Sequence, residues 1–162
     1  MEIPGKYVVL RPLAEGDVGA LRAIVAQPAV ALWWGEQPSG FPLTDEPTAT
    51  RFTILEDGDV AGMIQYSEEH EPDYRHASID LFVDAGRHGR GLGSDAVRAL
   101  ADYLVAERGH HRVTIDPAAD NHAAIRAYQK AGFRPVGVMR AAWRDFATGE
   151  WRDTLFMERV VT

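Results

Sequence analysis

The segment Gly86-Arg87-His88-Gly89-Arg90-Gly91-Leu92-Gly93-Ser94 decides the fold of this chain. The apolar stretch 77–83 precedes it and predicts a strand. An amphipathic helix is predicted from about Ser94 to Glu107, with a buried stripe of Ala96, Val97, Leu100, Leu104 and Val105. A strand that runs through glycine-rich backbone into a helix builds an anion site, because the first helical turn has unpaired N–H groups. Arg87 and Arg90 add positive charge nearby.

The spacing of these glycines excludes two common kinds of phosphate site. Gly89, Gly91 and Gly93 run G-x-G-x-G, whereas a dinucleotide-binding turn reads G-x-G-x-x-G and follows the first strand of a parallel sheet. A nucleoside triphosphate loop ends in Gly-Lys-Ser/Thr, and this turn contains no lysine. The turn also lies halfway along the chain, after segments that read as hairpins.

The rest of the chain predicts hairpins combined with two strand–helix units. Strands are expected at Tyr7–Leu10, Arg51–Glu56, Val60–Ser67, Ala77–Val83, Val113–Asp116, Phe133–Arg144 and Trp151–Val161. Further helices are expected after Asp17 and from Asp120 or Asn121 to about Ala131. The segment from Pro28 to Pro47 reads as a loop with at most a short helical turn. This mixture predicts an α+β fold with a largely antiparallel sheet.

Composition restricts the classes of function. A length of 162 residues fits one domain, 1–162. The net charge of −7 argues against general nucleic-acid binding. It would help to attract a cationic substrate, and acidity for solubility alone is the alternative explanation. No apolar run is long enough to predict a membrane span, and no cysteine is present to form a disulfide, a metal site or a nucleophile. Without a secretory signal at the first residues, a cytoplasmic location is expected.

A second block, Asn121-x-x-Ala124-Ile125-x-x-Tyr128-x-Lys130-x-Gly132-Phe133, follows the glycine-rich turn. Together the two blocks resemble the GNAT superfamily of N-acetyltransferases. The pyrophosphate loop of that superfamily usually reads Gln/Arg-x-x-Gly-x-Gly/Ala, and His88-x-x-Gly91-x-Gly93 matches it with His88 at the Gln/Arg position. The resemblance implies the GNAT fold, a mixed and mostly antiparallel sheet of about seven strands flanked by about four helices.

The same resemblance implies acetyl-coenzyme A as the acyl donor and no metal. It places the pyrophosphate on the backbone of the turn and the pantetheine beside the end of the preceding strand, with Tyr128 near the sulfur. The residues expected to bind the donor are Phe82, Val83, His88, Gly89, Arg90, Gly91, Leu92, Gly93, Ser94 and Asn121.

Acylation of an amine by a thioester requires that the ammonium group lose a proton and that the leaving thiolate be protonated or stabilised. An alkylamine with a pKa of about 10.4 is almost wholly protonated at pH 7, and only its neutral form attacks a thioester. Asp80, a lone carboxylate in an apolar strand, is the candidate base, because partial burial would raise its pKa. Tyr128 is the candidate acid or hydrogen-bond donor for the thiolate. The alternatives are a solvent-facing Asp80 at the sheet edge and a core Tyr128.

The acceptor side resembles aminoglycoside 6′-N-acetyltransferases. The segment Leu32-Trp33-Trp34-Gly35-Glu36 resembles their Trp-Trp-Gly segment, and Ile79-Asp80 and Asp116-Pro117-x-x-x-Asn121 resemble segments that line their acceptor site. Several ammonium groups need carboxylates as partners. The residues expected to bind the acceptor are Trp33, Trp34, Glu36, Asp80 and Asp116. The acidic stretch 68–73 could supply further carboxylates.

The residues expected at the acceptor site also have purely structural interpretations. The tryptophans could pack in the core, Asp116 could form an Asp-Pro turn, and the acidic stretch 68–73 could be a solvated loop. Other acceptors are a peptide N-terminus, a polyamine or a siderophore amine, and a non-enzymatic alternative is an acetyl-coenzyme A sensor. The chain is expected to act as a monomer or homodimer.

Overall fold

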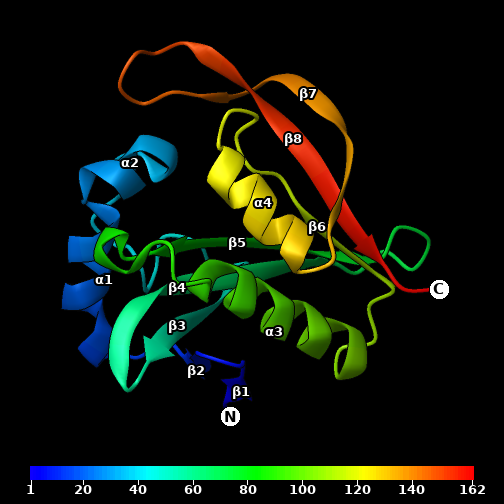
Figure 1. The fold of residues 1–162 in the computed structure, drawn as a ribbon, viewed down its shortest axis with the longest axis horizontal. Helices are drawn as coiled ribbons and strands as arrows, with labels where there is room; N and C mark the ends of the chain where they lie inside the picture. The colour runs from blue at the N-terminus through cyan, green and yellow to red at the C-terminus, as the bar shows by residue number, and fades with distance from the viewer.

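Eight strands form one mixed sheet in the computed structural model, which describes all 162 residues. The order across the sheet is β1-β2-β3-β4-β5-β6-β8-β7, and every neighbouring pair is antiparallel except β5 and β6 (Figure 1). The strands are β1 (Ile3–Pro4), β2 (Val9–Pro12), β3 (Thr50–Glu56), β4 (Asp59–Glu69), β5 (His76–Val83), β6 (Arg112–Ile115), β7 (Arg134–Arg144) and β8 (Trp151–Val160).

The mixed, mostly antiparallel sheet predicted from the sequence is confirmed, with eight strands instead of about seven. The additional strand is β1, which is only two residues long and has no alternating pattern to reveal it. The strand expected at Tyr7–Leu10 begins two residues later, as β2. The connection between the strands predicted at Val60–Ser67 and Ala77–Val83 is shorter than those bounds imply, because β4 continues to Glu69 and β5 begins at His76.

Helices cover both faces of the sheet. They are α1 (Val18–Val25), α2 (Pro28–Trp34), α3 (Leu92–Ala106) and α4 (His122–Lys130), with short 3-10 helices at Glu15–Asp17 and Ala85–Arg87. A cluster of 24 buried apolar residues contains the inner stripe of α3 and Tyr128 of α4, and a cluster of seven joins α1 and α2 to Met63 and Phe82. Figure 1 shows α1 and α2 on one side and α3 and α4 on the other. No helix is both long and apolar enough to cross a bilayer.

Two local expectations about the first helices were wrong. The segment after Pro28 forms α2, two turns long, because proline is favourable in the first turn of a helix and the next prolines come only after Trp34. Asp17 stands at the N-cap of α1, but its carboxylate makes no cap hydrogen bond to the helix. It accepts instead from Arg11, Thr53 and the N–H of Ala14, and these bonds lower its pKa to about 2 despite its burial.

The parallel pair β5–β6 covers only Ala77↔Val113 and Ser78↔Thr114. Beyond Ser78, β5 stays paired with β4 up to Val83, while β6 ends at Ile115 and the chain continues toward α4. Peptide groups along a strand point alternately to its two neighbours. Asp84 N–H donates to Ala61 of β4, so the peptide groups of Leu81 and Val83 point the other way, into the opening between the two strands.

Gly62 of β4 lies opposite Val83 at this opening. A Cβ at position 62 would meet the carbonyl oxygen of Phe82 and would lie 3.0 Å from Cα of Val83. Both obstacles are backbone, so a side chain here forces β4 and β5 apart. The close approach of the two strands therefore requires glycine.

We expect Gly62→Ala to lower the free energy of unfolding by roughly 2 kcal/mol, the usual size of an overpacking effect. Urea denaturation measures it. The matched control is Gly19→Ala on α1, where no atom lies within 4 Å of the added Cβ. That change is expected to raise stability by about 0.5–1 kcal/mol, because alanine is the better helix former. Equal stability of Gly62→Ala and the wild type would contradict the close approach.

Candidate active site

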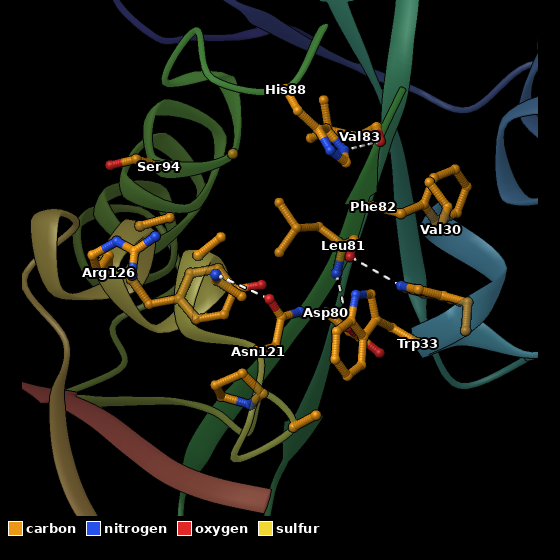
Figure 2. A pocket seen from close by; sticks show the side chains of 18 of the residues that line it. Val30, Trp33, Asp80, Leu81, Phe82, Val83, His88, Ser94, Asn121 and Arg126 are labelled. Carbon is orange, nitrogen blue, oxygen red and sulfur yellow. Dashed lines mark hydrogen bonds between the residues drawn. The ribbon is translucent and has the colours of Figure 1, made fainter. Parts of the chain in front are cut away.

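A cleft of about 880 Å³ opens where β5 and β6 diverge (Figure 2). Figure 2 shows Ser94 and Arg126 on the wall formed by α3 and α4, and Asp80 and Trp33 on the opposite side. Asp80 and Asp116 are the carboxylates that line the cleft. The cationic or potentially cationic side chains that line it come from the glycine-rich turn and α4 and are Arg87, His88, Arg126 and Lys130.

The glycine-rich turn presents open backbone to this cleft. Gly89 and Gly91 have φ angles of 83° and 78°, which side chains rarely adopt, and a Cβ at either position would have no atom within 4 Å. Gly91 is the N-cap of α3, and the first helical bond runs from Asp95 N–H to Gly91. The N–H groups of Leu92, Gly93 and Ser94 therefore lack helical partners. The predicted pyrophosphate cradle fits this backbone.

The arginines of the turn do not supply the expected free positive charge. Arg87 and Arg90 both donate to Glu56 of the β3–β4 hairpin, and Arg87 lies 3.6 Å from Asp84 and from Asp59. Hydrogen bonding to Glu56 raises the pKa of Arg87. Arg90, predicted to bind the donor, does not line the cleft. Sequence spacing could not reveal Glu56 as their partner, because it lies about thirty residues away.

His88 joins the turn to the end of β5. Its Nε2 lies 2.9 Å from the carbonyl oxygen of Val83, and because a carbonyl only accepts, Nε2 must carry the proton. His88 thus occupies one polar group of the free β5 edge, and Figure 2 shows its ring beside Val83. Val83 and Phe82, which were predicted to bind the donor, both line the cleft, although Phe82 is buried against Trp34 and Phe41.

Asp80 lies on β5 between Ile79 and Leu81, which pack in the large core, so its side chain points to the other face of the sheet. The open cleft leaves the carboxylate accessible to solvent, yet the surrounding protein desolvates it enough to raise its pKa to about 7. The N–H of Leu81 donates to it at 2.9 Å and opposes this rise, and the nearby Asp116 adds to it. Asp80 therefore changes charge near neutral pH.

Asp116 and Tyr128 face the same cleft from the other side. Desolvation raises the pKa of Asp116, which follows directly after β6. Tyr128 on α4 is 9% exposed, and its pKa is raised by desolvation and by the carboxylates of Asp80 and Asp116. The phenol consequently stays protonated at physiological pH and can donate a hydrogen bond.

Asn121 lines the cleft and begins α4. Its side-chain oxygen accepts from the N–H of Ala124 at 3.3 Å, which is the N-cap bond expected from the sequence. Because the oxygen is used by the helix, the side-chain NH₂ is the group available to a ligand.

The tryptophan pair divides into two roles. Trp33 lines the cleft, with its ring centroid 6.3 Å from that of Trp143 on β7. Trp34 also borders the cleft, but its indole N–H donates to the carbonyl of Leu81 at 3.1 Å and its ring packs edge-on against Phe82. It therefore anchors α2 to β5, in agreement with the core-packing alternative.

Two acidic parts of the chain lie outside the cleft. Glu36 does not line the cleft, because the chain turns away at Gly35, whose φ of 72° ends α2. The acidic stretch 68–73 is also absent from the cleft lining. Within it, Glu68 instead forms ion pairs with Arg108 and His110, at the end of β5 far from Val83.

Several cleft residues were missed by the sequence analysis. Arg126 and Lys130 lie four residues apart on α4, a spacing that puts them on one face and could have indicated a cationic wall. Trp143 and Thr154 come from β7 and β8, and no local pattern marks them as part of a site.

The cleft therefore has the layout of a group-transfer site, with open amides and cations for a phosphate-bearing donor and carboxylates for a cationic acceptor. Residues 15–133 match the sequence profile of the acetyltransferase (GNAT) family. The chain belongs to this family and is an N-acetyltransferase that uses acetyl-coenzyme A.

Individual relatives narrow the comparison. The chain is 28% identical over 155 residues to aminoglycoside N(6′)-acetyltransferase type 1 from Klebsiella pneumoniae, covering 82% of this chain and 76% of the relative. A structure of AAC(6′)-Ib with paromomycin and acetyl-coenzyme A superposes with a TM-score of 0.78 at 25% identity, covering 96% and 94% of the two chains. The ribosomal-protein-S5-alanine acetyltransferase of Vibrio fischeri has the same fold, with a TM-score of 0.83 at 15% identity and coverage of 99% and 96%.

The raised pKa of Asp80 predicts a pH-dependent stability. Between about pH 4 and 7 the folded chain holds a proton on Asp80 that the unfolded chain has released, so this group's contribution to stability falls as pH rises through that range. Asp80→Asn is neutral at every pH, and its side-chain oxygen can still accept from Leu81. We expect its melting temperature to exceed that of the wild type at pH 8, by a margin that shrinks toward pH 4.

Scanning calorimetry at pH 4.5, 6 and 8 measures this margin. The matched control is Asp73→Asn in the exposed 70–75 loop, which should not change the melting temperature. A mutant no more stable than the wild type at pH 8 would show that the ionised carboxylate carries no desolvation cost.

Proposed function

We propose that this chain transfers the acetyl group of acetyl-coenzyme A to the 6′-amino group of aminoglycosides. The observation that carries the proposal is a pair of carboxylates in the cleft that Trp33 also lines: Asp80 on β5 and Asp116 directly after β6, where the two strands diverge. The N(6′)-acetyltransferase relative supports the same acceptor and position. A cytoplasmic location and a monomeric or homodimeric state are part of the proposal.

The acceptor end suits a polycationic saccharide. Aminoglycosides carry several ammonium groups, which form charge-assisted hydrogen bonds with carboxylates such as Asp80 and Asp116. Trp33 and Trp143 offer apolar ring faces to the sugar rings. The net charge of −7 adds a long-range attraction for such cations.

The donor end is assigned to the glycine-rich turn and α4. The N–H groups of Leu92, Gly93 and Ser94 would hold the pyrophosphate, and Arg126 and Lys130 would neutralise phosphate charge. When bound, acetyl-coenzyme A supplies the electrophilic thioester carbonyl and a thiolate leaving group. Leu81 and Val83 of the free β5 edge line the cleft opposite α3 and α4.

Asp80 is proposed as the base that removes the proton from the acceptor ammonium. With its pKa raised to about 7, the gap to an amine of pKa about 10.4 narrows to roughly 3.4 pH units, or about 4.6 kcal/mol. An ordinary aspartate would face a gap of about 6.5 units. Tyr128, kept protonated by its raised pKa, is proposed to donate a hydrogen bond to the leaving sulfur.

We expect the purified chain to release free coenzyme A from acetyl-coenzyme A in the presence of kanamycin A, and NMR of the product to place the acetyl group on the 6′-nitrogen. Expression in a susceptible bacterium should raise its kanamycin and tobramycin resistance. Turnover of peptides or spermidine but not of kanamycin would transfer the proposal to the other amine acceptors. Tight donor binding without turnover of any of these amines would indicate a sensor.

We expect Asp80→Asn to lower kcat by about 10²–10⁴, the usual contribution of a general base, without changing the KM for acetyl-coenzyme A. In the wild type, kcat/KM should rise about tenfold per pH unit up to about pH 7 and then level off, because the base must be ionised. The mutant should lose this acidic limb. An unchanged kcat, or an acidic limb retained by the mutant, would remove Asp80 as the base.

A further inference from the structure

β7 contains a bulge whose middle residue has an unusual backbone. Met139 pairs with Thr154 and Trp143 pairs with Arg152, so residues 140–142 lie opposite the single residue Asp153. Within the bulge, Ala141 has a φ of 50°, in the left-handed region that residues with a Cβ adopt at an energetic cost. Such a conformation persists only where the surrounding structure holds it.

Asp153 makes the contacts that hold this bulge. Its Oδ1 accepts the N–H of Ala141 at 2.9 Å, and its carbonyl accepts the indole N–H of Trp143 at 3.3 Å. The same carbonyl accepts the N–H of Ala119 at 2.9 Å. Asp153 therefore connects the bulge and the ring of Trp143 to the loop that follows Asp116.

The bulge decides where Trp143 lies. Regular antiparallel pairing continued from Met139↔Thr154 would place Trp143 opposite Glu150 instead of Arg152. Two residues along a strand correspond to about 7 Å. This shift is as large as the 6.3 Å between the ring centroids of Trp143 and Trp33, so regular pairing would separate the two rings.

The hairpin also meets α2 at a second point. A Cβ on Gly35, at the end of α2, would lie 3.4 Å from Cβ of Phe146 in the β7–β8 turn. Figure 1 shows this turn extending over α2. Because Ala142 and Trp143 line the cleft, the bulged part of β7 borders it on the side facing α2.

We propose that Trp143 is an acceptor-specificity residue and that Asp153 is the positioning residue that sets it through the bulge. The inference rests on the proposed function, because it names the part of the site that binds the sugar rings of the acceptor. An indole face held beside Trp33 favours cyclic, ring-bearing amines, whose apolar faces it can cover, over linear amines such as spermidine.

The test uses Asp153→Ala, with Asp153→Asn as the conservative variant and Asp73→Ala as a control in an exposed loop. We expect Asp153→Ala to raise the KM for kanamycin A by roughly fivefold, as for loss of an aromatic contact, without changing the KM for acetyl-coenzyme A. Asp153→Asn keeps an oxygen that can accept from Ala141 and should behave as the wild type. Trp143→Ala should reproduce the selective KM increase if Asp153→Ala fails to fold.

Hydrogen exchange of residues 140–143 tests the bulge without any acceptor. Exchange should be faster in Asp153→Ala and unchanged in Asp153→Asn. An unchanged kanamycin KM in Asp153→Ala and Trp143→Ala, an equal rise in the KM for acetyl-coenzyme A, or unchanged exchange in Asp153→Ala would overturn the inference.

Failure of the wild type to acetylate kanamycin A would contradict the proposed function by itself. The same variants would then be assayed with spermidine and with a peptide bearing a free N-terminus, and exchange would still report the bulge. A ring-bearing amine that is acetylated should show the selective KM increase. A comparable KM increase for the linear amine spermidine would overturn the preference for cyclic amines.

Discussion

The short parallel pairing of β5 and β6 is the constraint on which the site depends. Two neighbouring strands normally hydrogen-bond along the edges that face each other, yet here the pairing covers only Ala77↔Val113 and Ser78↔Thr114. The free edge of β5 would leave carbonyl groups without partners, and side chains replace the missing strand: Trp34 donates to Leu81, and His88 contacts Val83. The opening therefore exposes backbone, helix N-terminus and carboxylates to one cleft.

The electrostatic environment of this cleft lowers the stability of the folded chain and favours proton transfer. Desolvation by the surrounding protein raises the pKa values of Asp80 and Asp116. Desolvation and the charges of these two carboxylates raise the pKa of Tyr128, so the three groups keep their protons to a higher pH than isolated side chains would. A carboxylate that is costly to ionise is a stronger base, and a phenol that keeps its proton is a reliable hydrogen-bond donor.

The local sequence pattern was sufficient to predict those parts of the structure that short segments determine. The glycine-rich turn, the inner stripe of α3 and the N-cap of α4 were predicted because backbone conformation and periodicity fix them within about ten residues. The errors share another cause. Arg90 bonds Glu56 and Trp34 bonds Leu81, and each partner is more than thirty residues away. Such contacts depend on which strands become neighbours in the sheet, and the local sequence pattern does not show which strands these are.

Acceptor choice has the same non-local origin. The fold does not determine it, since an acetyltransferase named for a ribosomal-protein alanine superposes as well as AAC(6′)-Ib does. The proposed donor side comes from one continuous stretch around the glycine-rich turn and from α4, whereas the proposed acceptor end combines α2, the residue after β6 and the bulge of β7. Two additional residues in one strand are enough to move an indole ring by about 7 Å. Changes in hairpin register can therefore alter the acceptor while the donor cradle stays the same.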